Sequence, residues 1–391
     1  MDAPALSLRR ALARLREQGL AWIGRRVAHE LAAPTTGPGK ALFRARLDLL
    51  GLIRALRGGA PQQAAMETEF VTAFYDLAAA PVTYDVVWFI AGAELARRAA
   101  GKAGVHFVVV PAETDGLREE TADYEQVVDR EARRSRLVNL TLPAFSLLPA
   151  MRGITLATSR RHAQHIRDRA DVVHPPAYEP SLPHFPEPQI VLRQAAAGQS
   201  CQVLESSTDA RRIIARWLDR VAQGRRVVTI TLRDYAFGSA RNSSVATWAA
   251  FAHSLDPAVW CVVILYDTGR TVDPLPDEMA GFPYLHEASW NLPLRLALYE
   301  AAWLNLGINS GPMVMLAFTR ARSITYRMVT EDVEQSSTAY MRRLGFIPGE
   351  TPPVAHRFCK WVWEPDTPEV IRREFDAMVA AIEAAPPDFT R

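Results

Sequence analysis

The chain has 391 residues, of which 49% are hydrophobic and 23% are charged, and its net charge is +2. This length exceeds what one hydrophobic core usually serves, so we expect two globular domains. No stretch approaches the ~20 consecutive apolar residues of a bilayer span, which excludes the membrane-spanning class. The three cysteines match no metal or disulfide spacing, which excludes the disulfide-framework class. Together with the lack of a recognisable secretion signal, this favours a cytoplasmic protein.

The first 60 residues are strongly basic. They carry eleven Lys or Arg and four Asp or Glu, a net charge of +7. Between Leu6 and Leu31 apolar residues alternate with arginines, a pattern typical of an amphipathic helix that lies on anionic lipid or packs on its own protein. Both interpretations stay open, so residues 1–60 are a candidate contact for the inner face of a membrane. Nucleic acid is not expected, because no aromatic and basic cluster accompanies the charge.

Residues 1–78 are predicted to be a helical N-terminal segment, with Pro/Gly breaks at 34–39 and 58–61. Beyond it, residues 84–91 form a near-continuous apolar run, which predicts a strand buried on both faces. Further strands are predicted at 106–110 and 153–158, and helices at 92–100 and 159–169. The proline-rich stretch 174–188 is unsuited to regular structure and marks a domain border.

The C-terminal half shows the clearest alternation of strands and helices. Strands are predicted at 226–232, 259–266, 304–308 and 323–328, and helices at 210–222, 245–255, 292–303, 312–320 and 372–383. This rhythm indicates one doubly wound α/β domain. Because ligands of such sheets lie beyond the carboxyl ends of the strands, the polar residues that follow each strand are the candidate site.

Two arginines and a small-residue turn follow the first of these strands. Arg233 comes directly after it, and Ser239, Arg241 and Asn242 precede the next helix. Arginine forks and free helix N–H groups bind phosphate, so this loop is a candidate anion site. The alternative is that Asn242 or Ser243 only caps the helix while Arg241 is solvated. The loop has neither a dinucleotide nor a P-loop glycine pattern.

Polar residues also follow two further strands. Asp267 is a candidate to hold a ribose or sugar hydroxyl, or equally the start of a turn. After the strand at 304–308, Ser310 can cap a helix, Gly311 lets a ligand approach the backbone, and Pro312 suits the first helical turn. Together with Asn309, these residues form a second candidate ligand loop at the same sheet edge.

The stretch 291–317 (NLPLRLALYEAAWLNLGINSGPMVMLA) resembles the C-terminal nucleotide-binding region of GT-B glycosyltransferases. It is similar in particular to the heptosyltransferase-like branch, where a helix and a strand lead into D-[ST]-G-P-M-H-x-A. Four positions match and two depart: Ser310, Gly311, Pro312 and Met313 match, whereas Asn309 replaces Asp and Val314 replaces His.

The resemblance implies an α/β fold with two facing Rossmann-like doubly wound domains and a helical N-terminal extension. Residues 1–78 would be the basic segment, 79–188 the acceptor domain and 189–391 the donor domain, whose final helix often crosses back to the first domain in that family. It further implies a metal-independent glycosyltransferase, without cofactor, that moves a sugar from a nucleotide-diphosphate donor to a glycan or lipid-linked acceptor. The sequence has no Asp-x-Asp metal motif. Arg233 and Arg241 would then balance the charge of the leaving group.

The general base is not identified by the sequence. Glu94, Glu113 and Asp115 are candidates in the N-terminal domain, with a surface or helix-start role as the alternative. His286, beside Tyr284, is a candidate to hold a nucleobase, or a partly buried histidine with a backbone partner.

Two other functions stay open. A sugar-nucleotide epimerase or hydrolase on the same fold would act without an acceptor. A non-catalytic binding protein would keep the fold without turnover, which would fit the replaced Asp and His of the motif.

Overall fold

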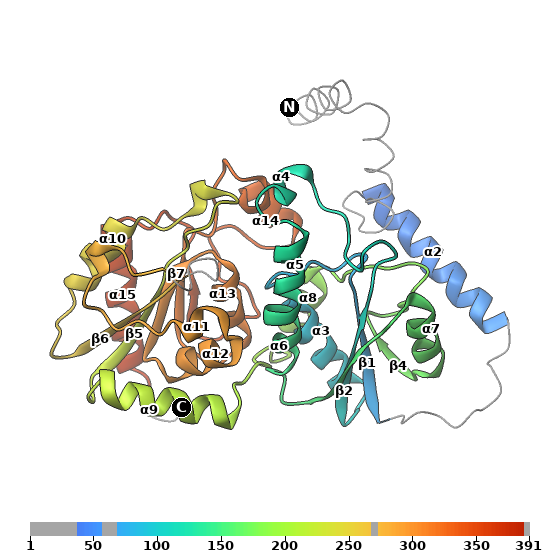
Figure 1. Ribbon diagram of the computed structural model, residues 1–391, viewed down its shortest axis with the longest axis horizontal. Coiled ribbons are helices and arrows are strands. Elements are labelled where there is room, and N and C mark those ends of the chain that lie inside the picture. Colours follow the sequence, from blue (N-terminus) through green and yellow to red (C-terminus); the bar gives the residue numbers. More distant parts are fainter. Residues whose placement is uncertain (1–36, 57–68, 267–272, 387–391) are drawn as a thin grey trace, which may run out of the picture. The chain divides into compact units, whose positions relative to one another are not determined.

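The computed structural model describes residues 37–56, 69–266 and 273–386 (Figure 1). The chain divides into two compact units that are not continuous in sequence. The first consists of Met1–Ala80, Val108–Arg118 and Thr155–Phe185; the second consists of Pro81–Phe107, Glu119–Ile154 and Pro186–Arg391. The predicted boundaries at 78 and 188 stay a prediction. In the described part of the chain, no helix combines the length and apolarity that a membrane span requires.

The N-terminal half contains a four-stranded sheet in the order β3-β2-β1-β4. Its strands are β1 (Phe70–Asp76), β2 (Gly104–Val110), β3 (Met151–Leu156) and β4 (Val172–His174). Its helices are α2 (Gly37–Leu56), α3 (Val86–Ala99), α4 (Ala122–Glu125), α5 (Arg130–Arg136), α6 (Leu142–Phe145) and α7 (Arg160–Arg169), with a π-helical turn at Leu137–Thr141. β1 and β4 are parallel, with Ala73 opposite His174. A core that includes Phe74 and Tyr178, stacked at 4.6 Å between ring centroids, packs on this sheet.

Two predictions for this half are wrong. Residues 70–76, placed in the helical segment, form β1, which ends in a fully buried run. The apolar run 84–91, predicted as a strand, is instead the start of α3, in which Val86 to Leu95 are all buried. A short, uniformly apolar run has no periodicity to separate a buried helix from a buried strand. In α3 the helix is reinforced by Glu94, which pairs with Arg97 and Arg98 one turn later.

The C-terminal half contains a five-stranded sheet in the order β6-β5-β7-β8-β9, with every neighbouring pair parallel. Its strands are β5 (Arg226–Thr231), β6 (Trp260–Leu265), β7 (Leu304–Ile308), β8 (Ser323–Tyr326) and β9 (Cys359–Trp361). Its helices are α8 (Pro188–Ala196), α9 (Thr208–Val221), α10 (Val245–His253), α11 (Glu287–Trp290), α12 (Leu292–Ala301), α13 (Gly311–Val314), α14 (Thr338–Arg343) and α15 (Pro368–Glu383). The predicted α/β class is confirmed.

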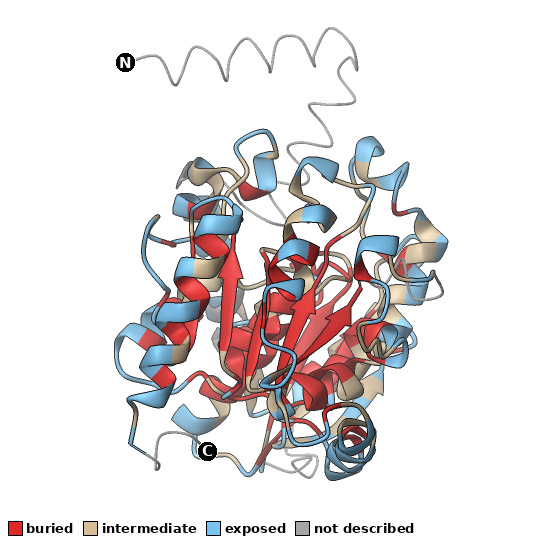
Figure 2. Cartoon of the chain, turned by 90° about the vertical axis from the view of Figure 1, so that its left-hand side faces the viewer, coloured by how far each residue is buried: buried red, intermediate tan, exposed pale blue. Residues whose placement is uncertain are grey.

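The burial pattern of the C-terminal half is that of a parallel sheet covered by helices. β7 is buried along its whole length, and β5 and β6 are buried after their first residue, whereas the helices expose one side (Figure 2). Near-continuous apolar strands are expected where helices cover both faces of a parallel sheet. The closing helix α15 packs against α10 and β8, and its Phe375 lies in the same core as Trp248 and Tyr326. This helix therefore completes the C-terminal sheet's own core.

Candidate functional site

The candidate site lies at the carboxyl edge of the five-stranded sheet, where the strand order changes direction. β5 is the first strand in sequence, and β6 and β7 pair on its opposite sides. Ligands of open parallel sheets bind outside the carboxyl ends of the strands at such a switch point. The loops that follow β5 and β7 are therefore best placed to hold a ligand.

Arg233, the second residue after β5, organises the loop that follows. It is 6% exposed. Its Nη2 donates to the carbonyl oxygen of Phe237 at 2.6 Å, and its Nη1 donates to the carbonyl oxygen of Gly238 at 3.1 Å and to Oδ1 of Asn242. Gly238 has a left-handed backbone (φ +63°), which glycine adopts without strain. Several N–H donors of Arg233 are therefore used in hydrogen bonds that hold the loop's conformation.

Arg241 joins the two loops. Its Nη2 donates to the carbonyl oxygen of Asn309 at 2.9 Å, and the side chain is half-buried. The alternative that Asn242 or Ser243 caps α10 is wrong, because Ser244 is the cap and its Oγ accepts from the Thr247 N–H at 3.3 Å. Ser239 is exposed on the same loop.

Asn309, directly after β7, is fixed by both its backbone and its side chain. The backbone N–H donates to the carbonyl oxygen of Tyr326 at 2.9 Å, and Nδ2 donates to that of Met328 at 2.8 Å. An aspartate could not make the second bond, because a carboxylate has no donor. The departure from the Asp of the resembling motif therefore has a structural reason in this chain.

Ser310 and Gly311 follow at the start of α13. Ser310 takes the N-cap position but makes no capping bond, and its Oγ is buried without a hydrogen-bond partner among the described residues. A buried hydroxyl without a partner costs about 1–3 kcal/mol, so such groups mark places where a ligand or water completes the bonding. Gly311 packs against the Tyr84 ring, and a Cβ there would lie 2.3 Å from Tyr84 Cδ2. Pro312 lies in the first turn of α13.

Sequence reasoning missed Arg327, which directly follows β8. Its backbone is left-handed (φ +49°), which is uncommon outside glycine. Its Nη1 donates to the carbonyl oxygen of Asn242 at 3.1 Å, and its Nε pairs with Oδ1 of the buried Asp366 at 2.7 Å. The rule that polar residues after buried strands deserve attention could have found it. Three guanidinium groups, those of Arg233, Arg241 and Arg327, therefore meet around one loop.

A second missed cluster surrounds Tyr235 in the same loop. Arg136 of α5 donates from Nη2 to the Tyr235 hydroxyl at 2.6 Å and from Nη1 to the Tyr124 hydroxyl at 3.1 Å. The Tyr124 ring in turn packs edge-on against Phe237 at 5.1 Å between centroids. The β5 loop is therefore supported on one side by α4 and α5 and on the other by Arg233.

The remaining donor-side candidates are Asp267 and His286. Asp267 lies outside the described residues. His286 is exposed next to α11, and its ring lies 3.9 Å, centroid to centroid, from that of Tyr284. Tyr284 forms a bridge with Ile264 of β6, so this aromatic pair lies beside the end of β6. The Gly238 carbonyl oxygen accepts from both Arg233 Nη1 and the Arg241 backbone N–H, so hydrogen bonds connect Arg233, Arg241, Asn242 and Asn309 into one network. His286 lies on a separate segment.

The three candidates for the general base lie in different surroundings. Glu94 does not follow a strand but lies inside α3, 3% exposed. Burial would raise its pKa, but hydrogen bonds from Arg97 and Arg98 outweigh burial and lower it. A paired carboxylate of lowered pKa is a poor proton acceptor. Glu113 and Asp115 are exposed in the loop after β2, and Asp115 has a left-handed backbone (φ +53°).

The first unit has its own polar cluster, which sequence reasoning missed, at the ends of β1 and β4. Asp76 ends β1 and is 1% exposed. Arg160 donates to both its carboxylate oxygens, at 2.9 and 2.8 Å, and the Tyr178 hydroxyl donates at 2.5 Å. Burial, and then the Asp76 charge, raise the pKa of Tyr178 well above its ordinary value. His174 ends β4, and burial lowers its pKa to about 3.

Arg160 also ties the surrounding loops together. Beyond Asp76, its guanidinium donates to the carbonyl oxygens of Pro111 and Pro180, which follow β2 and β4. One side chain thus links the loops after three strands of the first sheet. The signal available in the sequence was weak, because Asp76 lay inside a segment predicted to be helical.

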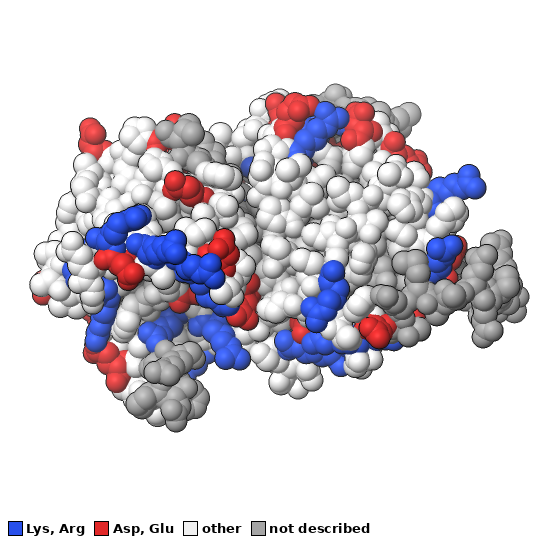
Figure 3. All heavy atoms as spheres, turned by 60° about the horizontal axis from the view of Figure 1, so that its bottom comes forward, with Lys and Arg blue, Asp and Glu red and all other residues white. Residues whose placement is uncertain are grey.

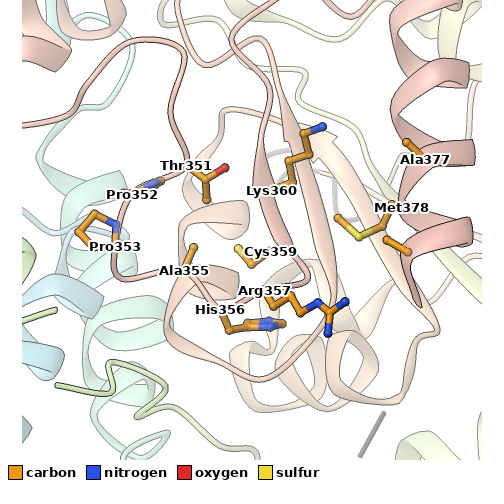
Figure 4. A pocket seen from close by; sticks show the side chains of 11 residues that line it. Thr351, Pro352, Pro353, Ala355, His356, Arg357, Cys359, Lys360, Ala377 and Met378 are labelled. Atoms are coloured by element: carbon orange, nitrogen blue, oxygen red, sulfur yellow. The ribbon is translucent and has the colours of Figure 1, made fainter. Parts of the chain in front are cut away.

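A hollow of about 510 Å³ lies apart from these loops, between β9 and α15 (Figure 4). Its lining includes His356 and Arg357, which precede β9, and Ala377 and Met378 of α15. Residues that precede a strand of a parallel sheet lie at its amino edge. The hollow is therefore at the opposite end of the strands from the switch point.

No protein-family model matches the sequence, and no curated protein matches it. Among solved structures, the fold is similar to that of the E. coli ADP-heptose lps heptosyltransferase II (TM-score 0.47, 11% identity, 81% of this chain and 100% of that chain). It is also similar to a glycosyl transferase family 9 structure from Veillonella parvula (0.45, 9%, 81% and 99%) and to E. coli heptosyltransferase WaaC (0.37, 13%, 79% and 99%). With TM-scores below 0.5, this likeness by itself assigns no function to the chain.

Proposed function

We propose that this chain is a glycosyltransferase that binds a nucleotide-diphosphate sugar at the β5/β7 switch point and transfers the sugar to a glycan or lipid-linked acceptor. The observation that carries the proposal is the bond from Arg241 to Asn309, beside the buried Ser310 hydroxyl, which has no hydrogen-bond partner in the described part of the chain. The bond brings a cation to the loop in which Ser310, Gly311, Pro312 and Met313 match the resembling motif. A diphosphate is the ligand whose charge and oxygen acceptors suit this combination.

Sugar transfer requires that the negative charge on the diphosphate leaving group is stabilised. As the bond between the sugar carbon and the diphosphate oxygen breaks, negative charge builds on the diphosphate, and the acceptor oxygen forms the new bond to the same carbon. Arg241 would stabilise the developing charge, and Arg327 would contribute to the positive potential around Asn242. The acceptor's proton passes to a base outside this network. Metal independence is part of the proposal, and it predicts that turnover survives a chelator.

Melting temperatures with a panel of nucleoside diphosphates and nucleotide sugars test the binding step. A ligand at a hundred times its Kd should add roughly 2.7 kcal/mol of stability. We expect one nucleotide series to shift the melting temperature, and Arg241→Ala to weaken its affinity by about 10- to 100-fold, the worth of a charge-assisted hydrogen bond. Arg212→Ala is the matched control, because Arg212 lies exposed on α9. No shift with any nucleotide would contradict the proposal.

Product analysis then separates the proposed reaction from its alternatives. Transfer requires an acceptor, so nucleotide release that depends on added glycan or glycolipid supports a glycosyltransferase. Release at the same rate without acceptor would instead show a hydrolase, and a changed sugar still attached to its nucleotide would show an epimerase. Tight binding with no product in either assay would show a binding protein.

A further inference from the structure

Helix α2 presents a stripe of leucines to its surroundings. Leu42, Leu49 and Leu52 are 53%, 55% and 56% exposed. At 3.6 residues per turn, the three side chains fall within an arc of about 80° on the helix surface. Single exposed apolar side chains are ordinary, but an aligned row of large ones on one helix marks a contact surface.

The other side of α2 is already used by its own unit. The Phe43 ring packs edge-on against His184 at 5.1 Å between centroids, and Phe43 and Leu47 are half-buried. Phe43 and Leu47 point away from the leucine stripe, because they lie about 100° or more around the helix from Leu42. The helix therefore has two apolar faces, one that anchors it and one that faces outward.

The charge on α2 has one dominant sign. Its sequence contains Lys40, Arg44, Arg46 and Arg54 against the single acid Asp48. Arg44 and Arg46 are exposed. Elsewhere the charges mix: on the face shown in Figure 3, basic and acidic side chains are interspersed. Arginine can extend its apolar stem along a hydrophobic surface and keep its charge in a polar layer.

We propose that α2 binds the surface of an anionic membrane, lying in the plane of the lipid headgroups. The leucine stripe of Leu42, Leu49 and Leu52 enters the boundary between headgroups and acyl chains, while Arg44 and Arg46 contact lipid phosphates. By the same helix geometry, Arg46 lies on one flank of the stripe, Asp48 on the other, and Arg44 farther round beyond Asp48. An outward apolar stripe on a helix of net positive charge is the combination that anionic bilayers select. The proposal is independent of the donor site, since vesicle binding and nucleotide binding are measured separately.

Co-sedimentation of the full chain with vesicles tests this. We expect binding to vesicles of phosphatidylcholine with phosphatidylglycerol, little binding to phosphatidylcholine alone, and weaker binding as salt screens the charges. The triple variant Leu42→Ser, Leu49→Ser, Leu52→Ser should lose about tenfold or more in vesicle affinity. A matched triple variant, Val138→Ser, Leu156→Ser and Ile347→Ser, should bind as the unaltered chain does, because these side chains are 59%, 57% and 60% exposed.

Two double variants that each remove two arginine charges complete the test. Arg44→Gln with Arg46→Gln should weaken binding to anionic vesicles and flatten its salt dependence, whereas Arg212→Gln with Arg216→Gln on α9 should leave both unchanged. Circular dichroism and melting temperature check that each variant is folded. Absence of binding to anionic vesicles would overturn the proposal, as would undiminished binding by a folded leucine variant. Self-association of the unaltered chain that the leucine variant abolishes, without lipid binding, would assign the stripe to a second copy instead.

Discussion

Arg241 and Asn309 lie 68 residues apart in sequence, and a 2.9 Å hydrogen bond from Nη2 to the backbone carbonyl joins them at the switch point of the C-terminal sheet. This bond links the loop after β5 to the loop after β7. It also holds the guanidinium next to Ser310, whose buried hydroxyl has no partner among the described residues. The proposed donor site follows from this pairing.

Replacing Asn309 by aspartate should reduce stability, although aspartate is the residue of the resembling motif. The carboxylate cannot donate to the Met328 carbonyl oxygen and would face it instead. We expect the free energy of unfolding to fall by about 1–3 kcal/mol in urea denaturation. Asn139→Asp is the control, since Asn139 is exposed and donates to nearby Ser135. An Asn309→Asp protein as stable as the unaltered chain would contradict this structural reason for the asparagine.

Gly311→Ala should also be destabilising, through steric overlap. The added Cβ would lie 2.3 Å from Cδ2 of Tyr84, closer than carbon atoms can approach. Overpacking of this kind costs about 1–3 kcal/mol. The same substitution made together with Tyr84→Ala removes the opposing ring, so the additional cost of Gly311→Ala should largely disappear in that background. An equal cost in both backgrounds, measured by denaturant unfolding, would show that Tyr84 is not the obstacle.

Arg160→Ala should be among the most damaging single changes in the first unit. It leaves the Asp76 carboxylate buried without its cation, and breaking a buried pair typically costs about 3–5 kcal/mol. Asp76→Asn in the same protein removes the uncompensated charge and should recover part of the loss. A double-mutant cycle by urea unfolding measures the coupling. Additive effects of the two substitutions would contradict a direct interaction between Arg160 and Asp76.

The stability of the chain should fall as the solution is acidified, in part through His174. Burial lowers the pKa of His174 from 6.5 to about 3, so between these values the unfolded chain binds a proton that the folded chain does not. Each pH unit below about 6.5 therefore removes up to about 1.4 kcal/mol from the free energy of unfolding, down to about pH 3.

The substitution His174→Gln should make this pH dependence shallower. Unfolding free energies measured between pH 7 and pH 5 would show the change. His165→Gln, at an exposed position of α7, should leave the slope as it is. An unaltered slope in the His174 variant would mean that this histidine is not buried in its neutral form.

Much of the C-terminal sheet could be predicted from sequence, because β5 to β8 are apolar runs that alternate with helices. The strand β7 was predicted with its observed bounds. The sheet edge was also the reason to choose the residues after β5 and β7 as candidates, and their role stays a prediction. The hydrogen-bond partners of Arg233 and Arg327 could not be predicted. Only the packing shows that Arg233 shapes its loop and that Arg327 reaches Asn242 from the neighbouring strand.

The N-terminal half was harder for a physical reason. Its segment 84–91 is apolar at every turn of the helix, because α3 is buried along its first ten residues, so neither period stands out. β1 follows a helix and a segment outside the described residues, and its one charged residue, Asp76, is buried through partners distant in sequence. Pairing over such distances leaves no local signal.

Hydrogen exchange read by mass spectrometry locates the bound nucleotide on the chain. The nucleotide that raises the melting temperature is added, and amide exchange is compared with and without it. We expect protection in residues 232–244 and 309–314, and we expect Arg241→Ala to lose it. Protection confined to the hollow beside β9 and α15, or to the loops around Asp76, would contradict a donor site at the β5/β7 switch point.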